Sequence, residues 1–196
     1  MSERNSFADR KRALEEEYFR RKEHELLERK RRGVELGADR KRMAEALVVV
    51  DQEILQGLQD LGYTGETVNL LYLAPLVQVA WAEGEITERE RRLIFEAAGL
   101  RGVKEASRAF QQLSEWLDRR PPEEFFNQTL RLIAAMWRTL PPDERDLKIN
   151  ELVSDCSSIA KASGGIMGFV KLGRSICREE EEILVQIAAE LKRSQA

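Results

Sequence analysis

The sequence predicts an all-α protein in which a long, charged N-terminal helix precedes a compact bundle of several helices. Residues 6–32 contain no glycine, proline or β-branched residue, as expected of a long helix. Beyond residue 39, apolar residues recur at spacings of three and four, and no strand-like alternation occurs anywhere. With 196 residues, the chain is long enough for one compact domain plus an appendage.

The predicted N-terminal helix has an unusually narrow apolar stripe. At 100° per residue, the stripe and its flanks consist of Phe7, Leu14, Tyr18, Phe19 and Leu26. Nearly every other residue in this stretch is charged, whereas a helix packed in a core carries a wider apolar face. Two interpretations remain open: the adjacent aromatic residues anchor a partner protein, or the helix is solvated and docks on its own domain.

Gly33 and Gly37 interrupt the helical pattern and predict a hinge, or at least a weak point in the helix. This hinge divides the chain into an N-terminal arm (residues 1–37) and a body (residues 38–196). Helicity is expected to resume at about Asp39, in a helix that ends at residues 62–65. Its predicted core face consists of Met43, Leu47, Val50, Ile54, Leu58 and Leu61.

The next stretch, residues 66–82, is almost continuously apolar and predicts a buried central helix that Pro75 kinks or splits. A turn at residues 83–85 follows. Thr87 and Glu90 then have the spacing of a capping box that opens a helix over 88–98. The remaining predicted helices are 103–118, 123–139, 142–162, a short apolar helix at 166–172, and 175–191.

The charge distribution separates the arm from the body. Through Arg42 there are 14 Lys and Arg against 10 Asp and Glu, and the remainder has 18 against 25. The basic excess is small and interleaved with glutamate, which argues against nucleic-acid binding. No apolar run approaches the roughly 20 residues of a membrane span. The acid-rich N-terminal stretch resembles neither a secretory signal nor a mitochondrial presequence.

The sequence predicts a cytoplasmic protein that is not an enzyme. Cys156 and Cys177 lack the spacing of a metal or redox motif and are expected to be buried thiols in a reducing compartment. No phosphate loop, nucleophile elbow, zinc motif or dinucleotide turn occurs. With His24 as the single histidine, the usual groups for acid–base or thiol chemistry are missing.

Residues 6–32 resemble, without a gap, the inhibitory segment of the mitochondrial ATPase inhibitor protein family. The matching residues are Phe7, Arg10, Ala13, Glu15, Glu16, Tyr18, Phe19, Arg20, Glu25, Leu27, Arg31 and Arg32. The resemblance implies an arm that folds as one helix into an α/β catalytic interface of the F1 part of ATP synthase and stops ATP hydrolysis.

Carried over by position, the resemblance assigns contacts to individual residues. Tyr18, Phe19 and Leu27 would pack against the C-terminal region of the β-subunit. Glu15 would pair with an arginine there, and Phe7 would lie near the rotor. The chain departs from the family in having Glu17 where a basic residue is usual. It also lacks the histidine-rich region and the dimerising coiled coil, so acid-triggered dimerisation is not expected.

A second stretch, residues 76–100, resembles the TerB-like domain, named for tellurite resistance. Its signature is an apolar helix, an acidic Gly-containing turn and a capped acidic helix, here Ala82-Glu83-Gly84-Glu85-Ile86-Thr87-x-x-Glu90. An internal echo relates Ile86, Glu90, Leu93 and Ala98 to Ile176, Glu180, Ile183 and Ala188. This echo is what a helical domain with two similar halves would show.

The TerB-like resemblance implies a divalent metal site, for which Glu83, Glu85 and Glu90 would supply oxygen ligands. The simpler alternative is that Glu90 caps its helix while Glu83 and Glu85 form a solvated turn. No cofactor other than such a metal is expected. The leading functional hypothesis is an inhibitor of F1-type ATP synthase. The alternative is a TerB-like stress-response or scaffold protein that self-associates through the N-terminal helix.

Overall fold

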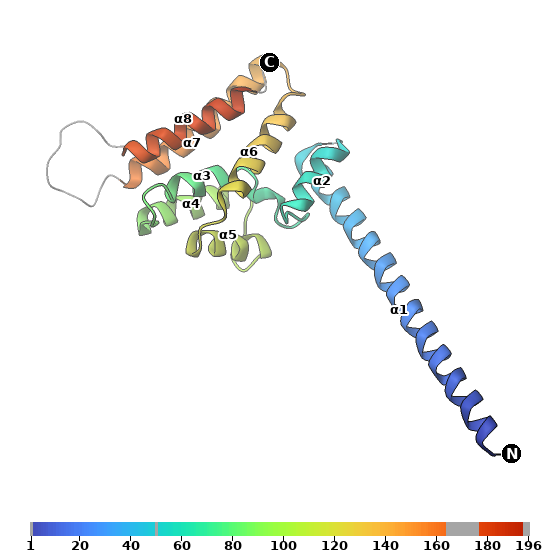
Figure 1. Cartoon of the computed structure of the whole chain (residues 1–196). Coiled ribbons are helices and arrows are strands. Elements are labelled where there is room, and N and C mark those ends of the chain that lie inside the picture. Colours follow the sequence, from blue (N-terminus) through green and yellow to red (C-terminus); the bar gives the residue numbers. More distant parts are fainter. Residues whose placement is uncertain (1, 50, 164–176, 194–196) are drawn as a thin grey trace. The chain divides into compact units, whose positions relative to one another are not determined.

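The computed structural model describes the backbone of residues 2–49, 51–163 and 177–193, and the side chains of Glu17 and of residues 20–49, 51–162 and 177–193. These residues form helices and turns without any β-strand (Figure 1). Two compact units can be distinguished, residues 1–41 and residues 42–196. Within the described residues, no helix combines the length and apolarity that crossing a membrane would require.

Helix α1 (Ser2–Leu47) is continuous, so the predicted interruption of the helix at Gly33 and Gly37 is wrong. Neither glycine has a positive φ, and a Cβ atom added at either position would meet no atom within 4 Å outside the adjacent backbone of the helix. A glycine costs a helix about 1 kcal/mol relative to alanine, which neighbouring strong helix formers offset. The helix ends instead at Leu47, and the next residue, Val48, has a left-handed φ of 55°. Such a φ is sterically costly for a β-branched residue, so it marks a real break.

The predicted single helix over residues 39–61 is therefore two helices, the end of α1 and α2 (Gln52–Asp60). Asp51 caps α2, since its Oδ1 accepts hydrogen bonds from the backbone N–H groups of Glu53 at 2.8 Å and Ile54 at 3.2 Å. Gly62, with φ of 85°, then turns the chain. Helix α1 still contributes to the core of the body, because Met43 is fully buried.

Pro75 divides the apolar stretch, as predicted, into a short 3-10 helix η1 (Val68–Leu70) and helix α3 (Ala74–Ala80). Pro75 lies in the first turn of α3, where a missing backbone N–H breaks no hydrogen bond. All seven residues of α3 are buried. The predicted central helix is thus confirmed, though it is shorter than expected.

The remaining described helices are α4 (Glu88–Leu100), α5 (Arg108–Asp118), α6 (Glu123–Trp137), α7 (Pro142–Ser163) and α8 (Arg178–Arg193). Helix α3 packs against α4, α6, α7 and α8, which places it at the centre of the body. Helices α7 and α8 lie side by side (Figure 1). The predicted helix over residues 166–172 lies outside the described residues.

The predicted helix at 103–118 begins five residues late, at Arg108. Ser107 caps it through a hydrogen bond from the Phe110 backbone N–H to Ser107 Oγ, at 3.2 Å. The preceding residue, Ala106, has a φ of 62°, which is incompatible with a continuing helix. The sequence pattern did not reveal this break. Val103 is an apolar residue that packs in the core, so it fits the apolar periodicity of the helix that follows although it lies outside that helix.

Gly65 lies in the turn between α2 and η1, against the last turns of α1. A Cβ atom at this position would collide with Cβ of Arg42. The φ of Gly65 is not left-handed, so close approach of the two segments explains the glycine here.

Candidate functional site

The described part of the N-terminal arm is an exposed helix. Over residues 20–37 every side chain except that of Glu28 is exposed. Leu26 is 56 % and Leu27 is 61 % accessible to solvent, values typical of surface positions rather than of a core. Arg20 is also exposed. The side chains of the other predicted partner-binding residues lie outside the described set, namely Phe7, Arg10, Glu15, Glu16, Tyr18 and Phe19.

Ion pairs between residues one helical turn apart stabilise the exposed segment as a helix. Arg21 lies 3.6 Å from Glu17, Lys22 lies 3.4 Å from Glu25, and Arg31 Nε lies 3.1 Å from Glu35. Pairs at these helical spacings contribute about 0.2–0.5 kcal/mol each. The described arm thus gains local support without burying Leu26 and Leu27, which remain available to another surface.

The predicted capping box at the start of α4 is present. The backbone N–H of Thr87 donates to Glu90 Oε2 at 2.8 Å, and the backbone N–H of Glu90 donates to Thr87 Oγ1 at 3.3 Å. The Thr87 hydroxyl adds a third hydrogen bond, 2.7 Å long, to the same carboxylate oxygen. Gly84, with φ of 89°, forms the preceding turn. Glu90 is buried, so its carboxylate is largely committed to the cap.

The same arrangement recurs at the start of α8, with cysteine in place of threonine. The backbone N–H of Cys177 donates to Glu180 Oε2 at 2.8 Å, and the backbone N–H of Glu180 points to Cys177 Sγ at 3.3 Å. Glu180 is fully buried. The echo between Glu90 and Glu180 in the sequence therefore corresponds to two capping boxes with matching geometry.

The two capping carboxylates also interact electrostatically. Burial raises the pKa of Glu90 above its ordinary value. Hydrogen bonds from Thr87 lower that pKa, and the nearby carboxylates of Glu180 and Glu83 raise it further. Burial likewise raises the pKa of the Cys177 thiol, to about 12, so this thiol is protonated at neutral pH.

The described residues bring Glu83 together with Cys177 and Glu180, whose potential ligand atoms lie within 4.8 Å of one another. This differs from the predicted metal set: Glu85 is exposed and outside the group, and Glu90 is engaged by Thr87. Calcium takes six to eight oxygen ligands, whereas this group offers two carboxylates and one thiol, which is not an oxygen ligand. The group therefore fits calcium or magnesium poorly.

The sequence analysis did not predict that Cys177 and Glu180, at the start of α8, lie beside Glu83. The echo paired Glu90 with Glu180, and that pairing could have placed Glu180 beside the acidic turn. Cys177 was not recognised as a helix cap because serine, threonine, aspartate and asparagine are the usual residues at that position.

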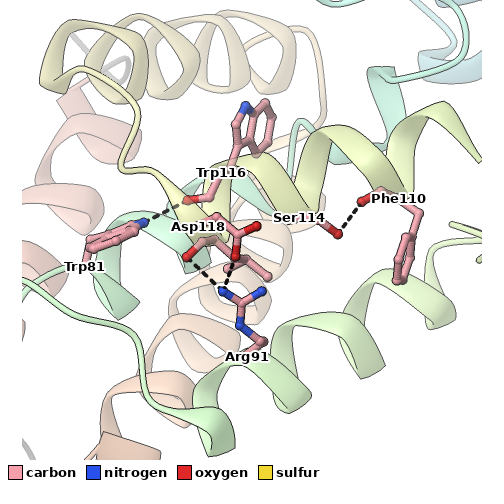
Figure 2. A network of polar contacts seen from close by, with 7 residues as sticks. Trp81, Arg91, Phe110, Ser114, Trp116 and Asp118 are labelled. Carbon is pink, nitrogen blue, oxygen red and sulfur yellow. Dashed lines mark hydrogen bonds and ion pairs between the residues drawn. The ribbon is translucent and has the colours of Figure 1, made fainter.

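A polar clamp fixes the C-terminal end of α5 (Figure 2). The Trp81 indole Nε1–H donates to the backbone oxygen of Trp116 at 2.9 Å. One guanidinium nitrogen of Arg91 donates to the backbone oxygen of Leu117 at 3.1 Å and to the Asp118 carboxylate at 2.6 Å. The last carbonyl groups of α5, which lack partners within the helix, are thereby satisfied from α4 and from the end of α3.

On the α2 and α6 side of the same helix end, a cavity of about 600 Å³ opens beside Tyr63, Trp116 and Phe125. Sequence reasoning treated the aromatic residues of the body as core and did not predict this cavity. The aromatic residues are indeed largely buried, with Trp116 9 % exposed, but their outer faces line the cavity.

The fold and these sites define the class of the protein as an all-helical protein with an exposed N-terminal helix and a helical body. No family model, curated protein or solved structure matches the chain.

Proposed function

We propose that the chain is a regulatory protein that inserts its N-terminal helix into a catalytic interface of an F1-type ATP synthase and blocks ATP hydrolysis. The observation that carries this proposal is the exposed state of the helix over residues 20–37, including Leu26 and Leu27. The resemblance of residues 6–32 to the ATPase inhibitor family supplies the partner.

The chemistry of the helix suits insertion into a groove. Burying one leucine side chain on binding contributes about 1.5–3 kcal/mol, and aromatic residues contribute more. Leu27, together with Tyr18 and Phe19, would serve as an apolar anchor, while Glu15 would set the register through an ion pair. A helix that already forms in the free chain loses less conformational entropy on binding than a disordered segment would.

The test measures ATP hydrolysis by purified F1-ATPase as a function of the concentration of the intact chain. We expect inhibition, and we expect Leu27→Ala to raise the half-inhibitory concentration about tenfold or more. Because Leu27 is 61 % exposed, this substitution leaves the body intact. Tyr18→Ala and Glu15→Ala are expected to abolish inhibition.

Glu23→Ala is the matched control, since Glu23 is exposed on the same helix and outside the residues that carry the resemblance. It should inhibit like the natural chain. Hydrolysis that proceeds unchanged at saturating concentrations of the intact chain would refute the proposal.

The alternative is a TerB-like scaffold or stress-response protein whose N-terminal helix binds a second copy of itself. The matching capping boxes at Thr87 and Cys177 favour a body with two similar halves. Sedimentation of the intact chain distinguishes this alternative: self-association that Leu26→Ala and Leu27→Ala both weaken, without inhibition of F1-ATPase, supports it. A calcium or magnesium titration of the melting temperature, with Glu83→Gln as control, tests its metal-responsive form.

A further inference from the structure

The cavity beside α5 has the size and composition of a small-molecule site, independently of what the N-terminal helix binds. Its volume of about 600 Å³ falls within the range of roughly 300–1,000 Å³ that is usual for ligand pockets. It lies between the C-terminal ends of α2 and α5 and the start of α6. Every lining residue belongs to the unit formed by residues 42–196.

Three aromatic rings from three segments contribute to the apolar part of the cavity, together with Leu61, Pro121 and Pro122. The ring centroids of Tyr63 and Phe125 are 5.9 Å apart in a stacked arrangement. Trp116 meets Phe125 at 5.0 Å and Tyr63 at 6.1 Å. Tyr63 directs its hydroxyl to Thr129 Oγ1 at 3.4 Å, and burial raises the pKa of Tyr63 above its ordinary value, so the ring stays neutral. The rings therefore offer a rigid surface on which a flat apolar group can stack.

Two backbone carbonyl groups at the end of α5 already accept hydrogen bonds from other parts of the body. Figure 2 shows Trp81 and Arg91 approaching the backbone at this helix end, while the indole ring of Trp116 points away from both. The carbonyl groups of Trp116 and Leu117 accept hydrogen bonds from those two side chains. At this end of the cavity, we therefore expect side chains to bind the polar group of a ligand.

Most charged side chains of the cavity already have partners. Asp118 is held by Arg91, Glu115 accepts a hydrogen bond from Gln112 at 3.2 Å, and Arg120 donates to Glu123 at 2.9 Å. Arg119 differs, because its guanidinium group makes no hydrogen bond or ion pair with the part of the chain that the structure describes. An unpaired arginine that lines the same cavity as the aromatic rings favours an anion with a flat apolar body.

We propose that this cavity binds a small aromatic monocarboxylate, with its ring against Trp116 and Phe125 and its carboxylate on Arg119. A carboxylate matches the fork of N–H donors of a guanidinium group and can accept two parallel hydrogen bonds from it. Glu115, also at the cavity, disfavours a second negative charge on the ligand and thus selects a monoanion.

The test titrates the intact protein with 3-phenylpropionate and, separately, with 3-phenylpropylamine, which has a similar shape and the opposite charge. The chain contains three tryptophans, so three indole N–H signals in a ¹⁵N-correlated NMR spectrum report on separate places. We expect the carboxylate to shift the Trp116 signal and leave that of Trp137, which stacks on Tyr72, unchanged. The amine should bind at least about tenfold more weakly.

Charge variants test the assigned contact. Arg119→Gln should weaken binding of the carboxylate about tenfold, and Glu115→Gln should strengthen it about two- to threefold. Arg108→Gln is the matched control, since Arg108 is exposed at the opposite end of the same helix and should leave the affinity unchanged. All three side chains are exposed, so none of the substitutions should unfold the protein.

Three outcomes would overturn the proposal. They are no shift of the Trp116 signal with carboxylate at up to about 5 mM, equal or tighter binding of the amine, and unchanged affinity of the Arg119→Gln variant.

Discussion

Glu90 stabilises the start of α4 as a capping residue, but burial and nearby carboxylates disfavour its charged form. Its carboxylate caps α4 through Thr87, yet it is buried near the carboxylates of Glu180 and Glu83. Its pKa is therefore raised in the folded state, so the folded protein binds a proton here more readily than the unfolded chain does. The resulting contribution to stability is fully present below the unfolded-state pKa of about 4.5, and it is lost as pH rises through the folded-state value.

The variant Glu90→Gln tests this linkage, because an amide oxygen can still accept the bond from Thr87 while carrying no charge. Relative to the natural chain, the variant should become more stable as pH rises from about 4.5 to 7, by about 1.4 kcal/mol for each unit by which the folded-state pKa exceeds the unfolded one. Thermal unfolding at several pH values, with a chelator present, measures the difference. A stability difference that stays constant across this pH range would contradict the prediction.

Arg91 and Arg92 are neighbours in sequence with different surroundings. Arg91 donates hydrogen bonds to the end of α5, whereas Arg92 forms an exposed ion pair with Glu96 at 3.9 Å. We expect Arg91→Ala to reduce the free energy of unfolding by about 1–2 kcal/mol, because a backbone oxygen and a carboxylate lose their donor. Arg92→Ala should change it by less than about 0.5 kcal/mol. Urea denaturation compares the two variants, and equal effects would refute the clamp.

At the scale of the helices, α1 contains two glycines that disfavour a helix, and the strong helix formers around them outweigh this effect. Its two glycines, at 33 and 37, have helical backbones and open space around them. A β-carbon therefore fits at both positions without a clash. Each glycine lowers the helical tendency of the segment without providing a turn or a close approach.

Replacing Gly33 and Gly37 by alanine should increase the helicity of α1, because each substitution favours the helix by about 1 kcal/mol. The ellipticity at 222 nm, followed as the temperature rises, measures the gain. Gly62→Ala is the contrasting variant, since φ of 85° strains any side chain there, and it should destabilise the body by about 1 kcal/mol. A double variant whose helicity does not rise would contradict the prediction.

At the scale of the whole molecule, the unit formed by residues 42–196 contains its own core. The first fully buried side chain along the described chain is Met43, which packs in that core. Over residues 20–37, the described side chains are exposed except for that of Glu28, which is partly buried. The stability of the body should therefore depend on the end of α1 and not on the arm.

A shortened chain that begins at Ala38 should melt cooperatively, within about 2 °C of the intact chain. In the same shortened chain, Met43→Ala should cost about 2–5 kcal/mol, as expected for truncating a buried methionine. Differential scanning calorimetry measures both variants. A large drop in melting temperature on removing residues 1–37 would mean that the arm contributes to the fold of the body.

The all-α class, the position of the central helix and the Thr87 capping box could be predicted, because periodicity, proline and cap residues are local signals. The break at Val48 could not, since a valine with a left-handed φ has no propensity signature. The late start of α5 was hidden for a similar reason. The clustering of Glu83 with Cys177 and Glu180 depends on tertiary packing, which joins residues about 90 positions apart. The cavity at α5 depends on which faces of Tyr63 and Trp116 stay uncovered, and periodicity does not determine that.

The crowding at Gly65 has an evolutionary consequence. With the β-carbon of Arg42 occupying the adjacent space, even a methyl group cannot be accommodated unless the two segments separate. Among homologous sequences, position 65 should therefore almost always be glycine, whereas positions 33 and 37 should accept other residues. That contrast between positions 65 and 33 or 37 would show whether orthologues share the same junction.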